Sequence, residues 1–115
     1  MMSAGRAKFA RIWRGRTPRQ KADDYQRYWL QHGIAPLEAK GALSVEMLRE
    51  DRETETEFVT ISYWESIEAM TGGSAADPRQ AHHLERDAEF LIELPRAVQI
   101  LTILDRRGSG GWSGV

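Results

Sequence analysis

Apolar and polar residues alternate most regularly between residues 57 and 66, in the stretch EFVTISYWES. Three β-branched or aromatic residues fall on one face of an extended chain, and the rings of Phe58 and Trp64 fall on the other. Alternation with a period of two in such residues is typical of a strand. Because both faces are apolar, the pattern predicts a central strand with other parts of the chain packed on each side.

Three further segments have the pattern of strands, namely residues 8–14, 42–49 and 97–104. The charged run over residues 50–57 is interpreted as the solvated tip of a hairpin, which makes the strand before it antiparallel to the central strand. The segment 97–104 is almost continuously apolar, and this predicts an interior position in the sheet.

A first helix is predicted to begin at Thr17 and Pro18 and to end at Gly33. Thr17 offers a capping hydroxyl, Pro18 suits the first helical position, and aromatic residues then recur at helical spacing. Such a stripe is typical of a helix face packed on a sheet. Residues 34–41, which contain Pro36, are predicted as a connector.

Two more helical patterns follow the central strand. Ser66 can cap a short helix over residues 67–71, which the glycines after it end. Asp77 and Pro78 resemble the start of the first helix, and the apolar residues between 81 and 91 predict a second longer helix.

The order of elements is strand, helix, strand, strand, helical region, strand. This order predicts an α+β fold, the ferredoxin-like split βαβ arrangement, with an antiparallel four-stranded sheet and both helices on one face. The domain is expected over residues 8–104, with a flexible N-terminus over 1–7 and a flexible Gly/Ser-rich tail over 105–115 that includes Trp112. The uncovered apolar face of the sheet predicts a homodimer packed sheet to sheet.

Composition narrows the function classes. The chain has 115 residues, a net charge of -1 and no cysteine. The balanced charge gives no electrostatic footprint for nucleic acid or an anionic membrane, and no apolar run approaches the ~20 residues of a membrane span. The absence of cysteine excludes zinc-thiolate, iron–sulfur and thiol chemistry, and no metal site is predicted. We expect a cytoplasmic protein.

Arg11 is the unusual residue of the first strand, because it shares a face with Phe9 and Trp13. The interpretation we favour is a side chain that snorkels at the sheet edge. The alternative is a contact with an anion or a carbonyl group inside a pocket.

Three stretches carry a resemblance to a known family. FARIWRG in the first strand, SYWESIEAM at the end of the central strand, and DAEFLIELPRAV before the last strand together make the chain resemble the antibiotic-biosynthesis-monooxygenase-like family of dimeric α+β barrels, over residues 8–104. The resemblance is greatest to its small uncharacterised members. It implies a ligand cavity between the sheet and the helices of each subunit.

The resemblance implies one of several activities. Some members of the superfamily are monooxygenases that use no cofactor and oxidise aromatic quinol-type substrates, some degrade haem, and some have no known reaction. For a monooxygenase, His83 is the candidate catalytic base, and the substrate pocket is expected to include Arg11, Trp13, Tyr25, Trp29, Trp64 and His82. Because neighbouring positions of a helix diverge by about 100°, at most one of the two histidines is expected to face the cavity, and a structural role for the pair is the interpretation we favour.

The haem-degrading branch is disfavoured by the same resemblance. His83 stands where that branch has its axial histidine, but Trp13 and Gly73 replace its asparagine and tryptophan. The leading hypothesis is therefore a homodimer that holds an apolar or aromatic small molecule and needs no cofactor. The alternatives are a non-catalytic binding or sensory module and a haem-binding protein that uses His83.

Overall fold

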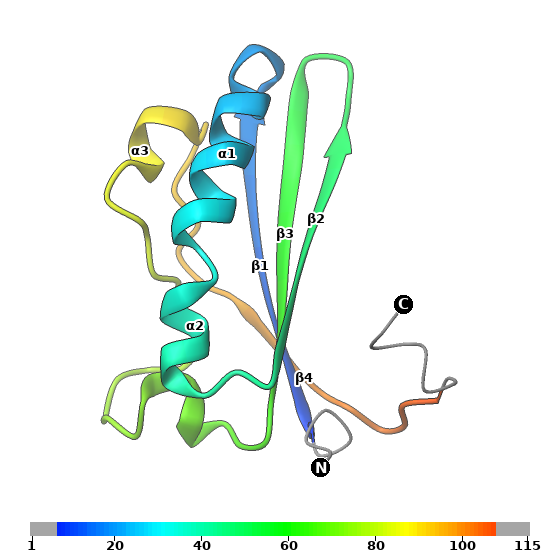
Figure 1. Cartoon of the computed structure of the whole chain (residues 1–115), viewed down its shortest axis with the longest axis vertical. Helices are drawn as coiled ribbons and strands as arrows, with labels where there is room; N and C mark the ends of the chain where they lie inside the picture. Colours follow the sequence, from blue (N-terminus) through cyan, green and yellow to red (C-terminus); the bar gives the residue numbers. More distant parts are fainter. Residues whose placement is uncertain (1–6, 108–115) are drawn as a thin grey trace.

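The computed structural model describes residues 7–107 (Figure 1). The predicted flexible N-terminus up to residue 6, and the part of the predicted tail that contains Trp112, lie outside the described residues. The elements are β1 (Phe9–Pro18), the 3-10 turn η2 (Arg19–Lys21), α1 (Ala22–His32), α2 (Ala35–Lys40), β2 (Ser44–Asp51), β3 (Glu55–Trp64), the 3-10 turn η3 (Glu68–Thr71), α3 (Asp87–Phe90) and β4 (Gln99–Thr102).

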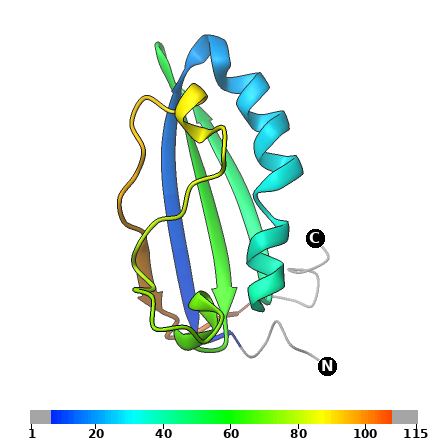
Figure 2. The same ribbon diagram turned by 90° about the vertical axis from the view of Figure 1, so that its left-hand side faces the viewer.

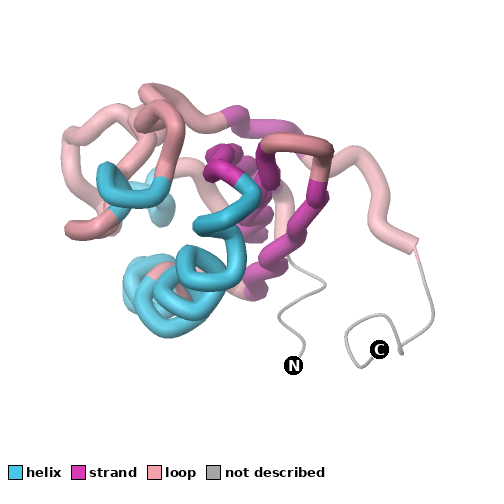
Figure 3. The backbone as a smooth tube through the Cα atoms, turned by 90° about the horizontal axis from the view of Figure 1, so that it is seen from above, coloured by secondary structure: helices cyan, strands magenta, loops and turns pink. Residues whose placement is uncertain are grey.

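A four-stranded antiparallel sheet in the order β2-β3-β1-β4 forms one layer of the fold. Strand β3 pairs with β1 from Trp64↔Phe9 to Glu55↔Pro18 and with β2 on its other side. Every second residue of β3 is buried, and the helices lie on that side of the sheet (Figure 3). The predicted ferredoxin-like order, the central strand and the antiparallel hairpin are all confirmed.

Aromatic side chains join α1 to the sheet. Tyr25 and Trp29 of α1 both meet the ring of Phe58 on β3 in edge-to-face contacts, with centroids 5.1 and 5.4 Å apart. Edge-to-face contacts between buried rings stabilise a fold beyond the burial of their area, by about 0.5–1.5 kcal/mol each. The predicted aromatic stripe of the first helix is therefore confirmed as part of the core.

The predicted start of the first helix is wrong, because β1 continues as far as Pro18. Thr17 is fully buried, pairs with Thr56 in the sheet register and donates its hydroxyl to the carbonyl oxygen of Pro18 at 3.0 Å. The ten-residue pairing with β3 thus competes successfully with the local helix-start pattern. The α-helix begins only at Ala22, after the turn η2.

The predicted connector over residues 34–41 is in fact the short helix α2. Pro36 lies in its first turn, where a missing N–H group costs little. Gly41 ends the helix with a φ of 107°, a conformation that L side chains rarely adopt. Six residues are too few to show an apolar stripe, so the periodicity did not reveal the helix.

The long helix predicted between residues 77 and 91 is also wrong, since only α3 is helical there. Gln80 instead forms an antiparallel bridge with Ala97, and the N–H of Ala81 donates to the carbonyl of Arg96 at 3.0 Å. The chain between η3 and β4 is therefore largely irregular and runs beside the sheet (Figure 2). Strand β4 is shorter than predicted and lies at the sheet edge rather than in its interior.

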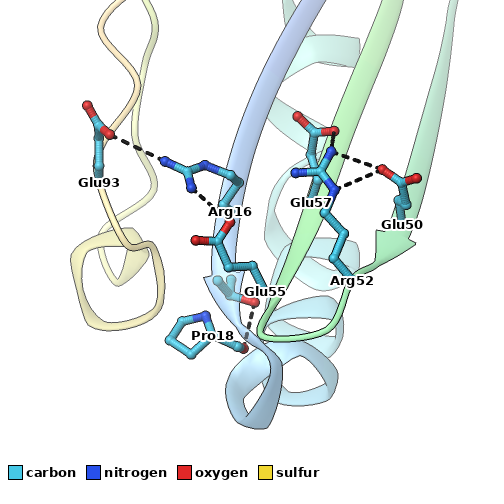
Figure 4. A network of polar contacts seen from close by, with 8 residues as sticks. Arg16, Pro18, Glu50, Arg52, Glu55, Glu57 and Glu93 are labelled. Atoms are coloured by element: carbon cyan, nitrogen blue, oxygen red, sulfur yellow. Dashed lines mark hydrogen bonds and ion pairs between the residues drawn. The ribbon is translucent and has the colours of Figure 1, made fainter.

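The charged run forms the exposed tip of the hairpin between β2 and β3, as predicted, with residues 50–54 all exposed. Arg52 forms ion pairs with Glu50 and Glu57 at 2.9 and 2.8 Å, and on β1 Arg16 pairs with Glu55 at 2.8 Å (Figure 4). These acids and bases lie at the end of the sheet where β2 and β3 meet, and they connect neighbouring strands through side chains.

The face of the sheet opposite the helices is open and carries a cluster of apolar side chains, with Arg14 of β1 and Glu46 of β2 on the same face. Val59 and Ile61 of β3 are only half-buried there, while Leu48 of β2 and Leu101 of β4 are 48% and 43% exposed. Register pairs place Leu48 beside Val59 and Ile12 beside Ile61, so these side chains form one surface. We call it the open sheet face.

Candidate functional site

A cavity of about 200 Å³ lies between the sheet and the helical layer. Both strands at the sheet centre, the end of α1, α2 and the irregular segment before α3 contribute to its wall. Its lining residues are Arg11, Trp13, Trp29, Gly33, Pro36, Leu37, Lys40, Thr60, Ser62, His82, His83, Leu84 and Asp87. We call it the sheet–helix cavity.

Two hollows elsewhere have larger volumes, 460 and 580 Å³, but they are shallower surface features. One lies at the β4 edge of the sheet beside Ile12 and Arg14, and the other lies beside α1 around Tyr28 and Arg86. Neither combines a buried aromatic side chain with a buried charged one. The sheet–helix cavity does, and it is therefore the candidate functional site.

Trp13 and Trp29 form the aromatic wall of the cavity, with ring centroids 5.9 Å apart. The ring of Trp13 reaches over Gly15, where the Cβ atom of any other residue would approach its Cη2 atom to 2.5 Å. A larger residue at position 15 would displace that ring, so Gly15 allows the indole of Trp13 to occupy its place in the cavity wall. Both tryptophans were predicted as pocket residues, and the structure brings them together.

Arg11 is buried beside this wall rather than snorkelling at an edge, so the favoured interpretation of its role is wrong. Its Nε–H donates to the carbonyl oxygen of Pro78 at 3.3 Å, and Nη2 donates to that of Gln80 at 3.0 Å. Burial lowers the pKa of Arg11, because desolvation disfavours a charged group. The alternative interpretation, a carbonyl contact inside a pocket, describes its geometry.

Both His82 and His83 line the cavity, although at most one was expected to do so. The expectation assumed a helix, and the segment that contains them is irregular, so the two side chains need not diverge. Both histidines remain largely exposed and therefore lie at the cavity mouth. Burial lowers the pKa of His82, and the nearby charges of Lys40 and Arg11 lower it further, which favours the neutral imidazole.

Asp87 is a buried acid at the inner end of the cavity, and it was not among the predicted site residues. Its Oδ1 accepts a hydrogen bond from the Tyr25 hydroxyl at 3.1 Å, and its Oδ2 accepts one from the Leu84 N–H at 2.8 Å. Burial raises the pKa of Asp87, while those hydrogen bonds and the charge of His83 oppose the rise. Burial and the adjacent Asp87 also raise the pKa of Tyr25.

Tyr25 and Trp64 were predicted as pocket residues but do not line this cavity. Tyr25 is fully buried behind it and reaches it through Asp87. Trp64 is also fully buried, and its Nε1–H donates to the Ser62 hydroxyl at 2.8 Å. Both residues thus position side chains that do line the cavity.

Sequence reasoning missed the wall that α2 contributes. Pro36, Leu37 and Lys40 come from this helix, and their segment was predicted as a connector. Thr60 and Ser62 were assigned to the correct strand face beside Phe58, but as strand residues and not as part of a site. The alternation along β3 was the signal that placed them on the cavity side.

The fold and this cavity define a ferredoxin-like α+β protein with a cavity of about 200 Å³ between sheet and helices. Residues 9–85, more than half of the chain, match the sequence profile of the family described as antibiotic biosynthesis monooxygenase. The chain therefore belongs to that family, as the resemblance indicated.

A solved structure supports the same fold. It is the crystal structure of a Bacillus cereus protein assigned to the antibiotic biosynthesis monooxygenases, with a TM-score of 0.60 and 15% sequence identity over 90% of this chain and 99% of that chain. At this identity the similarity concerns the fold alone. No curated protein matches the sequence.

The described part of the chain offers neither a membrane-spanning helix nor a cluster of metal ligands. Within residues 7–107, no helix is long and apolar enough to cross a membrane. Over the same range, no group of three or more His, Asp or Glu side chains is arranged to hold a metal ion.

Proposed function

We propose that this protein is a cytoplasmic homodimer that holds one aromatic or apolar small molecule in each sheet–helix cavity and oxidises it as a monooxygenase without a tightly bound cofactor. The observation that carries the proposal is the combination in one hollow of two indole rings, two histidines and a buried arginine. An apolar wall with a few polar groups is the usual composition of a small-molecule site.

In such a reaction the substrate itself supplies the electrons. A base removes a proton from an electron-rich aromatic substrate, and the carbanion reacts with O₂; one oxygen atom enters the product and the other leaves in water. We assign the base to His83, because an imidazole can act as a general base and this one lies at the mouth of the cavity. Arg11 and His82 are positioned to stabilise the negative charge that develops on the substrate.

The homodimer is the second part of the proposal. Its support is the open sheet face, where apolar side chains of β1, β2 and β3 lie together. Among residues 7–107, no helix runs over this face of the sheet (Figure 3). Contiguous apolar surfaces of this kind usually bind a partner, and a second copy related by a two-fold axis is the simplest one.

Oxygen consumption tests the enzymatic part directly. With quinol-type aromatic substrates, we expect uptake of O₂ by the purified protein and a loss of about 10²-fold or more in His83→Ala, the usual effect of removing a general base. His32→Ala is the matched control, because His32 is also exposed but lies on α1 outside the cavity lining.

A protein that binds aromatic molecules but shows no oxygen uptake with any of them would contradict the enzymatic proposal. The same result would favour the alternative of a non-catalytic binding or sensory module. The enzyme and the binding module would share every feature of the site described above. Only a measurement of activity separates them, because a fold does not determine a function.

Haem fits this site poorly. The cavity of about 200 Å³ is below the range of roughly 300–1,000 Å³ that is usual for ligand pockets, and a porphyrin is a large ligand. His83 could still bind iron from the cavity mouth, which is the haem-binding alternative. Titration with haemin tests it, and we expect no Soret band that depends on His83.

A further inference from the structure

We propose that the ligand of the sheet–helix cavity is a small aromatic carboxylate, with its carboxylate against Arg11 and Lys40 and its ring against Trp13 and Trp29. The inference rests on the proposed function, since it names the class of molecule that the same cavity binds. It rests on the charges around the cavity, on their lack of acidic partners and on the cavity volume.

Basic side chains from three separate segments line the cavity. Arg11 comes from β1, Lys40 from the end of α2, and His82 from the irregular segment before α3. The charges of Lys40 and Arg11 both act on His82, which places the three groups within electrostatic reach of one another. Arg11 and Lys40 are the cations among the three, and they create a positive potential where the walls meet.

These cations are not neutralised by acids of the described chain. None of the ion pairs between residues 7–107 includes Arg11 or Lys40. Arg11 is buried with two carbonyl oxygens as partners, and a buried charge without a counter-charge is costly. An anionic ligand would supply that counter-charge.

Asp87 does not serve as the counter-charge. It is the single acidic side chain among the described residues that line the cavity, and its two oxygens accept hydrogen bonds from Tyr25 and Leu84. Burial raises its pKa, which lowers its tendency to be ionised. Its hydrogen bonds thus hold Asp87 against Tyr25 and Leu84 and not against the cations Arg11 and Lys40.

Size and shape select a single aromatic ring. A volume of about 200 Å³ equals that of roughly seven water molecules in the liquid, at about 30 Å³ each. The rings of Trp13 and Trp29, tilted by 33° to each other, offer apolar surface for one aromatic ring. A guanidinium group matches a planar carboxylate better than any other anion-binding side chain, and two of the five N–H groups of Arg11 are used by the main chain.

Benzoate and its neutral isostere benzamide are the probes for the first experiment. Binding is followed by NMR through the indole N–H signals of the four tryptophans. We expect benzoate to shift the signals of Trp13 and Trp29 more than that of Trp64, which lies behind the cavity wall. Benzamide should bind about tenfold or more weakly, and raising salt from roughly 20 to 300 mM should weaken benzoate binding far more than benzamide binding.

Lys40→Gln removes a positive charge from the cavity wall without disturbing the core, because Lys40 is only half-buried at the end of α2. Arg11 is not a suitable choice, since its side chain holds the main chain of residues 78–80. We expect it to weaken benzoate binding about fivefold and to leave benzamide binding unchanged. Lys21→Gln is the matched control, since it makes the same change of charge on a lysine outside the cavity lining.

The outcomes separate this inference from the proposed function. If benzoate and benzamide bind equally well and Lys40→Gln affects neither, the carboxylate inference is wrong while the proposal of an aromatic-binding cavity stands. If neither probe shifts the signals of Trp13 and Trp29 at millimolar concentration, both proposals are contradicted.

Discussion

Arg11 and Asp87 are the two buried charged side chains beside the cavity, and the chain stabilises them differently. Arg11 donates to two carbonyl groups of the irregular segment and so holds that segment on β1. Asp87 accepts from a tyrosine hydroxyl of α1 and from a main-chain N–H. Each residue thus connects elements far apart in the sequence, and the cavity between them depends on both contacts.

Asp87 leads to a prediction on stability and pH. Its folded-state pKa is raised from the ordinary value of 3.8, so the folded state binds the proton more tightly than the unfolded state. Stability from this group is fully present below pH 3.8 and is lost as pH rises through the folded pKa, at about 1.4 kcal/mol per unit of pKa difference. Relative to the wild type, Asp87→Asn should therefore gain stability as the pH rises from 3.8 through the folded-state pKa of Asp87.

Urea unfolding at several pH values measures this difference. The quantity of interest is the free energy of unfolding of Asp87→Asn minus that of the wild type. In this difference, the pH-dependent contributions of the other carboxylates cancel. Asp24→Asn, an exposed aspartate on α1, is the matched control. A difference for Asp87→Asn that stays constant over this pH range would show that the burial of Asp87 does not perturb its ionisation.

Among the elements, those with a long amphipathic pattern could be predicted from the sequence, and the others could not. The alternation of β3 and the aromatic spacing of Tyr25 and Trp29 identified the strand and α1, since ten or more residues carried each signal. The segment after residue 77 misled the prediction because Ala81 and Leu91 are buried without being helical. Its conformation depends on main-chain pairing with Ala97, a contact that local periodicity does not reveal.

The candidate site was predicted in part for the same reason. Trp13 and Trp29 belong to the strongly patterned elements and line the cavity as predicted. Arg11 lies on the same face of β1 and lines the cavity too, although the favoured interpretation placed its side chain at the sheet edge. Lys40 belongs to a helix of six residues, and Asp87 belongs to a turn of helix with four residues. Their roles arise from tertiary packing, so no short-range pattern could indicate them.

Gly41 allows a prediction at the level of α2. Its φ of 107° ends the helix, and a Cβ atom there would meet nothing within 4 Å, so a substitution changes only the backbone energy. Gly41→Ala should lower the free energy of unfolding by about 1–2 kcal/mol, whereas Gly41→Asn should lower it less, because asparagine tolerates positive φ better. Thermal unfolding measures the stabilities of the wild type and both variants. Equal stability of Gly41→Ala and the wild type would contradict the prediction.

At the scale of the whole molecule, the two faces of the sheet have different roles. One face carries the core and the cavity, with Phe58 and Trp64 fully buried on it. The other carries a cluster of apolar side chains that no helix of residues 7–107 covers, although the guanidinium carbon of Arg106 lies 4.5 Å from the centroid of the Tyr63 ring on it. A chain of this size does not usually leave a contiguous apolar surface in water, and this contrast motivates the proposed homodimer.

Ile61 lies near the centre of the open sheet face, beside Ile12 on β1 and opposite Glu46 on β2. For the proposed dimer, light scattering at micromolar concentration should give about twice the chain mass of 13.1 kDa. Ile61→Lys would place two charges in a desolvated interface and should give the mass of a single chain, with the fold retained by circular dichroism. Leu30→Lys is the control, because Leu30 is 51% exposed on α1, on the opposite layer, and should leave the dimer intact. A wild-type protein with the mass of one chain would contradict the homodimer and leave the cavity as a site within a single subunit.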